Sequence, residues 1–231
     1  MQFGMKFYRA AAVCSVLSAV TTLLLIFLPD FFAPADGFEG RMARVYDPAY
    51  AARSWVYFVH PFITMMAALA VAMRVRHLRP GLAIVGLIAF LLWGFTEAAQ
   101  QGMTLFAFDK WRVAFATADE ATRSQIRTLT VMYDGLWDGM YFLILVAFAI
   151  ANLCFGLMLL RLEGLGRVVG GFYVAACVLT LTLIWRELGW GAVPEPFASW
   201  SYPAIQPLAR ILIGVWLWRM ADESTPLRGG N

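Results

Sequence analysis

The chain has little charge and few of the residues from which metal and haem sites are commonly built. Of its 231 residues only 14% are charged, and it has three cysteines and two histidines. His60 lies in an apolar stretch and His77 in a basic turn, so one chain cannot form a multi-histidine metal centre or a bis-histidine haem site. The sequence therefore predicts no metal and no cofactor.

Other common sources of chemistry are also missing. The two lysines, Lys6 and Lys110, fall outside the apolar stretches, which excludes a retinal-type Schiff base. There is no glycine-rich phosphate loop, no GxSxG nucleophile elbow and no HExxH pair. The net charge of the chain is small, at +3, and the basic residues are spread over short connections. Both features argue against a nucleic-acid partner.

Hydrophobic residues dominate what remains. They make up 61% of the chain, and the mean hydropathy is +0.68, far from the profile of a water-soluble domain. Crossing roughly 30 Å of hydrocarbon takes about 20 apolar residues in a helix. We expect an all-α polytopic membrane protein, a single bundle over residues 1–231 with six transmembrane helices near 7–28, 55–73, 81–108, 129–160, 168–188 and 203–220.

Two of these segments, 81–108 and 129–160, are longer than a bilayer requires. Helices of that length tilt or extend beyond the hydrocarbon region. The first segment raises a different alternative, because its basic start and the Ala33-Pro34-Ala35 sequence resemble a secretory signal. Its apolar run of about 19 residues exceeds the roughly 7–15 of a signal peptide and favours a membrane span.

Arginine placement predicts the orientation. Most short connections on one side of the bundle are basic, which the positive-inside rule makes cytoplasmic. Both termini should then be cytoplasmic, although arginines on the other side weaken the bias, namely Arg41, Arg44, Arg53, Arg112, Arg123 and Arg127. The basic residues on the predicted cytoplasmic side include Lys6, Arg9, Arg74, Arg76, Arg79, Arg161, Arg167 and Arg219.

Arg210 is the most informative residue for function. It stands within the last apolar stretch, where a guanidinium costs several kcal/mol by some scales and usually faces a bundle interior. At about 1.5 Å per residue it lies roughly 12 Å from the predicted cytoplasmic boundary. The same count places other polar residues at roughly 20 Å or more from that boundary, namely His60, Glu97, Gln100 and Asp138.

Polar groups thus gather in the outer half of the predicted bundle. We expect a cavity that opens outward, closes near mid-membrane and has Arg210 at its floor. Glu97 is the expected countercharge, with Gln100 and Gln101 beside it at i+3 and i+4. A structural ion pair that only fixes helix registry is the alternative. The expected walls comprise Glu97, His60, Asp134 and Asp138.

Asp134 and Asp138 lie one helical turn apart around Trp137. Gly135 and Gly139 form a small-xxx-small pair that would let another helix approach these carboxylates. A solvated helix end explains the same residues, because the depth count puts them near the outer surface.

Arg186 and Glu187 close the fifth predicted helix. They fit either the edge of a ligand site or an interfacial pair that neutralises itself. Pro61 and Pro207 interrupt hydrogen bonding within the second and sixth helices, close to His60 and Arg210, and such kinks help to shape pockets.

Three segments carry a resemblance to a known group of proteins. They are GLMLLR at 156–161, GLGR at 164–167 and GVWLWR at 214–219. Together with six predicted helices and a basic first helix, they resemble a large family of bacterial integral membrane proteins of unknown function. The likeness covers mainly the last 80 residues; it implies a bacterial inner-membrane protein and transfers no active site.

Three functions fit these observations. The leading one is binding of a small amphiphile or lipid-like molecule, with membrane lipids as the surrounding partners. The second is an intramembrane enzyme in which Glu97, Asp134 or Asp138 performs acid/base chemistry on such a molecule. The third is a structural or assembly subunit of a membrane complex. The predicted ligand-binding residues are Arg210, Glu97, His60, Gln100, Gln101, Trp137, Arg186 and Glu187.

Overall fold

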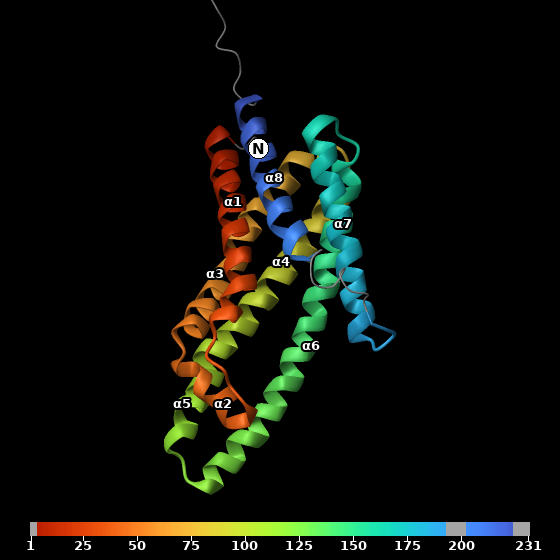
Figure 1. Ribbon diagram of the computed structural model, residues 1–231. Helices are drawn as coiled ribbons and strands as arrows, with labels where there is room; N and C mark the ends of the chain where they lie inside the picture. Colours follow the sequence, from red (N-terminus) through yellow and green to blue (C-terminus); the bar gives the residue numbers. More distant parts are fainter. Residues whose placement is uncertain (1–3, 193–201, 224–231) are drawn as a thin grey trace, which may run out of the picture.

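The computed structural model describes residues 4–192 and 202–223, and all regular structure within them is helical (Figure 1). This confirms the all-α class. The helices are α1 (Met5–Phe27), α2 (Gly37–Ala43), α3 (Pro48–Val75), α4 (Pro80–Met103), α5 (Asp109–Thr117), α6 (Glu120–Leu159), α7 (Gly164–Glu187) and α8 (Tyr202–Glu223).

Five stretches are long and apolar enough to cross a membrane, and they indicate a multi-pass membrane protein. They begin with α1, α3, α4, α6 and α7. The sixth expected segment, 203–220, lies within α8, which is less apolar because it carries Arg210 and Arg219.

Six helices close into a ring. Each packs against two neighbours in the order α1, α3, α4, α6, α7 and α8, and α8 returns to α1. Neighbours along the chain run in opposite directions, so α1 begins and α8 ends at the same, upper end of the molecule in Figure 1. A closed ring of six helices leaves an interior that side chains from every member can reach.

Two helices extend past the ring, as their length predicts. α4 continues through a π-helical turn at Thr104–Phe108 into α5, and α6 has 40 residues, about 60 Å at 1.5 Å per residue. Together with α2 they form an outer lobe at the lower end in Figure 1. Its own small core contains Met42, Phe108, Phe115, Ile126 and Tyr133.

Helix caps explain why two helices begin earlier than hydrophobicity predicts. The Asp119 carboxylate accepts from the Thr122 amide at 2.9 Å and starts α6 nine residues before position 129. The Asp47 carboxylate likewise accepts from the amides of Ala49 and Tyr50 and starts α3 at Pro48. Backbone amides, with that of Ala33 foremost, hold the pKa of Asp47 below its usual value. Side-chain capping thus lengthens helices whose apolar part alone is shorter.

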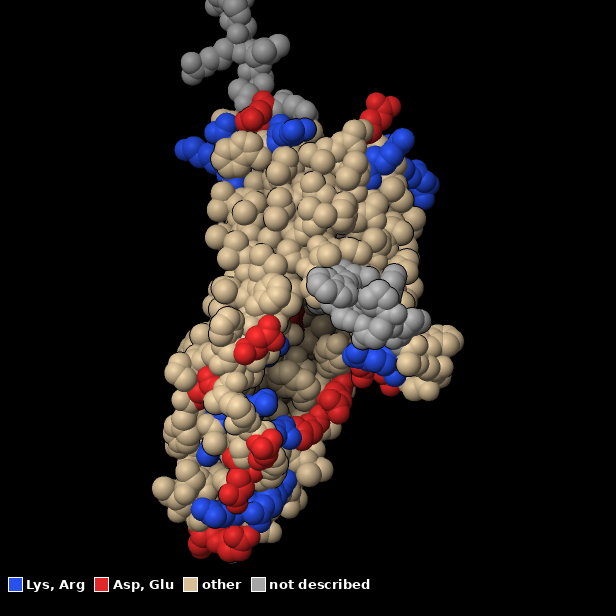
Figure 2. Space-filling model, in the orientation of Figure 1, with Lys and Arg blue, Asp and Glu red and all other residues tan. Residues whose placement is uncertain are grey.

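Charged residues divide the surface into zones (Figure 2). Lys and Arg gather at the end where α1 begins, an uncharged band follows, and both signs cover the outer lobe. The band has the composition expected of a lipid-facing surface. The basic end is the one predicted to be cytoplasmic, and the sidedness stays a prediction.

α1 and α8 pack very closely. α1 buries a stripe of small residues, and a Cβ added at Gly214 of α8 would lie 3.0 Å from the Ala12 carbonyl oxygen and 2.8 Å from Val16 Cγ2. Small residues permit this approach between apolar helices. The buried stripe on α1 consists of Ala11, Ala12, Ser15, Ser18, Ala19 and Thr22.

Gly135 and Gly139 do not serve such a contact. A Cβ added at either position meets no described atom within 4 Å. The expectation that these glycines bring another helix beside Asp134 and Asp138 is therefore wrong for the described chain. Both glycines are exposed and lie on the part of α6 that extends towards the outer lobe.

Gly214→Ala should lower the free energy of unfolding by about 1–3 kcal/mol, because the methyl group overpacks the contact with α1. Gly135→Ala is the matched control and should raise it by roughly 0.5–1 kcal/mol, because alanine favours the helix and finds open space. Unfolding by SDS in mixed micelles measures both. Equal effects of the two substitutions would contradict this account of the α1–α8 contact.

Candidate functional site

A cavity of about 420 Å³ lies inside the helical ring, and all six ring helices line it. Its polar lining is concentrated on α3, α4, α7 and α8, whereas Trp93, Ile144 and Phe148 supply apolar walls. Figure 2 shows the surface hollowed where the bundle meets the outer lobe. The titratable residues on the lining are Arg53, Tyr57, His60, Glu97, Tyr141, Arg186 and Arg210.

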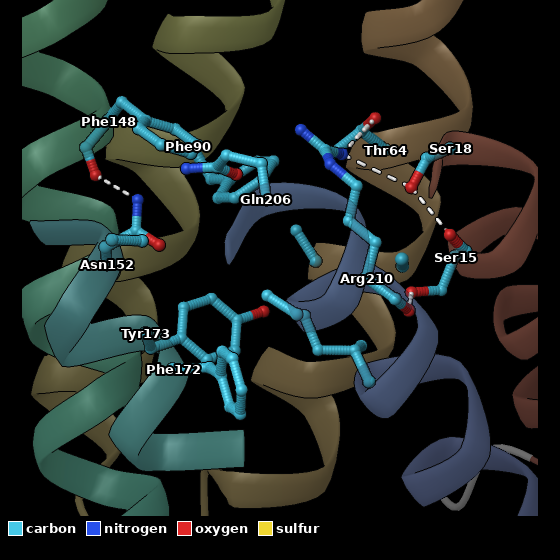
Figure 3. Close-up of a pocket in the computed structure, with 15 residues that line it drawn as sticks. Ser15, Ser18, Thr64, Phe90, Phe148, Asn152, Phe172, Tyr173, Gln206 and Arg210 are labelled. Atoms are coloured by element: carbon cyan, nitrogen blue, oxygen red, sulfur yellow. Dashed lines mark hydrogen bonds between the residues drawn. The ribbon is translucent and has the colours of Figure 1, made fainter. Parts of the chain in front are cut away.

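Arg210 points into the bundle and is only 8% exposed. Its Nη1 donates to the Thr64 hydroxyl at 2.9 Å and to the Ser18 hydroxyl at 3.2 Å (Figure 3). The Ser15 hydroxyl donates to the Arg210 carbonyl at 2.6 Å. Hydroxyls from α1 and α3 therefore fix this guanidinium inside the helical ring.

Glu97 lines the same cavity from α4 and is 6% exposed. The Tyr57 side chain hydrogen-bonds to it, and Arg210 is near enough to attract it electrostatically. Its Oε2 atom is buried and has no hydrogen-bond partner in the described part of the chain. The cavity thus contains a strong acceptor that the described protein leaves unused.

His60 is buried and hydrogen-bonded through both ring nitrogens. Nδ1 lies 2.7 Å from the Thr21 hydroxyl and Nε2 lies 3.4 Å from the Thr64 hydroxyl. The Thr64 hydroxyl also donates to the His60 carbonyl at 2.8 Å. His60 therefore has a packing role in addition to its place on the cavity wall.

Arg53 and Tyr57 are cavity residues that sequence reasoning missed. With His60 they occur at i, i+4 and i+7 on one face of α3. Arg53 Nε donates to the Leu25 carbonyl at 3.2 Å, and its guanidinium lies 5.3 Å from the centre of the Tyr57 ring. The helical spacing back from His60 was a usable signal. Arg53 was instead assigned to a connection, because α3 was expected to begin at residue 55.

Arg186 and Glu187 lie at the end of α7. Arg186 lines the cavity, and its Nη2 donates to Glu187 Oε1 at 2.8 Å. Both residues are exposed, which agrees with the self-neutralising alternative. Glu187 does not line the cavity. Of these two residues, Arg186 alone can contact a ligand bound there.

Asp134 and Asp138 do not wall this cavity, contrary to expectation. Asp134 accepts two hydrogen bonds from Arg41 of α2, one from Nη1 at 2.8 Å, and this contact raises the pKa of Arg41. Asp138 is exposed. The reason is the extension of α6, which carries these carboxylates away from the ring and into the outer lobe. Of the three proposed catalytic carboxylates only Glu97 lines the cavity.

The remaining predicted residues also belong to the lobe. Gln101, Trp137 and Asp134 line a second pocket of about 180 Å³, which shares Arg53 with the cavity, and Gln100 Nε2 donates to the Trp137 carbonyl at 3.0 Å. The structure therefore groups Arg210, Glu97, His60 and Arg186 in one cavity. It separates them from Gln101, Trp137 and Asp134.

A smaller chamber of about 40 Å³ adjoins Arg210 (Figure 3). Gln206, Asn152 and Tyr173 line it together with aromatic rings, and Gln206 Nε2 has no hydrogen-bond partner in the described residues. At roughly 10–15 Å³ of this volume per water molecule, about two to four waters fit. Arg210 and Phe148 line both the larger cavity and this chamber.

The described residues contain no group of three or more histidine, cysteine and acidic side chains placed to hold a metal ion. No protein-family model, curated protein or solved structure matches the chain. The resemblance to the bacterial membrane-protein family stays a prediction. The function must therefore be argued from the cavity itself.

Thr64→Val should lower the free energy of unfolding by about 1–3 kcal/mol more than Thr180→Val. Both threonines are buried and bond to the carbonyl four residues earlier, but only Thr64 also accepts from Arg210. SDS unfolding of the two variants therefore reports the contacts of the Thr64 hydroxyl with Arg210 and with His60 Nε2 together. Equal losses would show that Thr64 does not hold the guanidinium.

Proposed function

We propose that this protein binds a small amphiphilic molecule in the cavity inside its helical ring. A volume of about 420 Å³ falls in the range of roughly 300–1,000 Å³ typical of small-molecule sites. Apolar walls with a few converging polar groups are also typical of such sites. An amphiphile suits a cavity of this composition because its tail can contact the aromatic walls while its head meets the charges.

The charge balance of the lining favours an anionic head. Among the described lining residues, the guanidinium groups of Arg53, Arg186 and Arg210 face one carboxylate, that of Glu97. Glu187 pairs with Arg186 from outside the lining, and the described lining still has a net positive charge. Arginine binds carboxylates and phosphates through several aligned donors. The convergence of three arginines inside a ring of apolar helices is the observation that carries the proposal.

The proposed setting is the inner membrane of a bacterium, with α8 as a sixth span. α8 closes the ring between α1 and α7 and turns Arg210 inwards, so its charge does not have to face lipid. With the basic end of the bundle in the cytoplasm, both termini are cytoplasmic and the cavity opens to the outer side.

Acid/base catalysis on the bound molecule is the second candidate. Glu97 Oε2, buried beside the cavity without a described partner, favours it. If Glu97 transfers a proton, Glu97→Gln should retain the bound molecule and abolish its conversion, seen as the absence of any change in its mass. A purely structural pairing of Arg210 with Glu97 is disfavoured, because an open space beside a registry contact weakens helix packing.

Leu183→Trp should weaken binding of dodecyl phosphoglycerol roughly tenfold or more. Leu183 lines the cavity, and an indole there overfills it at a cost of about 1–3 kcal/mol. Leu181→Trp is the matched control on the same helix, because Leu181 is 52% exposed on the outer face of the ring. Native mass spectrometry of the protein in a neutral detergent counts bound molecules.

The wild-type protein and Leu181→Trp should each bind one dodecyl phosphoglycerol per chain, and this binding should saturate. Equal binding by all three proteins would place the amphiphile on the outer surface and contradict the proposal. Absence of saturable binding by the wild type would contradict it as well.

A further inference from the structure

Glu97 points to a second feature of the ligand. Its side chain is nine-tenths buried, it borders an open cavity, and Oε2 receives no hydrogen bond from the described protein. Leaving a buried carboxylate oxygen without a donor is costly, so this atom calls for a donor from within the cavity.

The surroundings of Glu97 show where the anionic part of a ligand would lie. Tyr57 hydrogen-bonds to Glu97 with its side chain, and the Arg53 guanidinium lies over the ring of the same tyrosine. One aromatic side chain therefore stands between a cation and a carboxylate. The hydrogen bond that Arg53 makes to the Leu25 carbonyl uses Nε, which leaves its terminal nitrogens available to an anion.

These two positions together define the head group. A hydrogen-bond donor of the ligand would contact Glu97. A negatively charged group, joined to that donor by a short linker, would contact Arg53. Trp93 and Phe148, on the same cavity wall, would contact the apolar part.

We infer that the ligand is an amphiphile whose head combines an anionic group with an N–H or O–H donor, and that Glu97 accepts from this donor while Arg53 binds the anion. The inference rests on the proposed function and narrows it. Head groups of this class include phosphoethanolamine, with an ammonium donor, and phosphoglycerol, with hydroxyl donors.

Four phosphodiesters with the same dodecyl tail test the inference. Dodecyl methyl phosphate has the anion without a donor, and dodecyl phosphocholine adds a positive charge without an N–H. Dodecyl phosphoethanolamine and dodecyl phosphoglycerol supply the two kinds of donor. Native mass spectrometry of the full chain in a neutral detergent gives the relative affinities of all four.

The wild-type protein should bind the ethanolamine or the glycerol diester roughly 10- to 100-fold more tightly than the methyl diester, as a hydrogen bond to a charged group implies. Whichever of the two binds more tightly identifies the donor as an ammonium or a hydroxyl. Methyl diester binding as tightly as both would overturn the inference while leaving the proposed function intact. Failure of all four to bind would overturn the proposed function itself.

Dodecyl phosphocholine separates a hydrogen bond from simple charge attraction. Its affinity should match that of the methyl diester, since it offers no N–H. Affinity equal to that of the tighter donor-bearing diester would contradict donation to Glu97.

Variants assign the effect to residues. Glu97→Leu should bring the donor-bearing diesters to the affinity of the methyl diester, because it removes the acceptor. Arg53→Gln should weaken all four roughly equally, because each carries the anion. Glu163→Gln, at an exposed carboxylate before α7, is the matched control and should preserve the wild-type order.

Persistence of the donor preference in Glu97→Leu would refute the role of Glu97. If that variant fails to fold, the four affinities of the wild-type protein still decide whether a donor is recognised.

Discussion

The burial of the Arg210 guanidinium inside the helical ring is the constraint on which the rest of this structure depends. A guanidinium is costly to bury without hydrogen-bond acceptors, so the side of α8 that carries Arg210 faces hydroxyl groups of neighbouring helices. The Arg210 guanidinium donates to the hydroxyls of Ser18 and Thr64, and the Ser15 hydroxyl donates to the Arg210 carbonyl. These contacts join α8 to α1 and α3, and the small residues of α1 allow the close approach that they require.

Ring closure then produces the cavity. Once α8 packs between α1 and α7, six helices surround a common interior, and residues far apart in sequence share one wall. Arg53, Glu97 and Arg186 meet there because the ends of their helices face the same opening. The outer lobe has its own aromatic core, and Arg41 binds Asp134 in this lobe.

Local patterns predicted much of this arrangement. The five long apolar helices follow from hydrophobic length, and the inward orientation of Arg210 follows from the cost of a charge in lipid. The prediction failed for Asp134 and Asp138, because a depth count assumes that every helix stops at the same level, whereas α6 continues into the lobe. It missed Arg53 because an aspartate cap, and not hydrophobicity, sets the start of α3.

The sequence by itself determined that this chain is helical, that most of it suits a lipid environment, and that Arg210 needs an interior partner. Those properties depend on composition and on spacing within single helices. Only the tertiary structure decided which polar residues share a cavity, because that depends on how helices far apart in sequence are rotated and how far each extends. Glu97 and Arg53 illustrate the difference: both are visible in the sequence as charges, but only packing places them on either side of Tyr57.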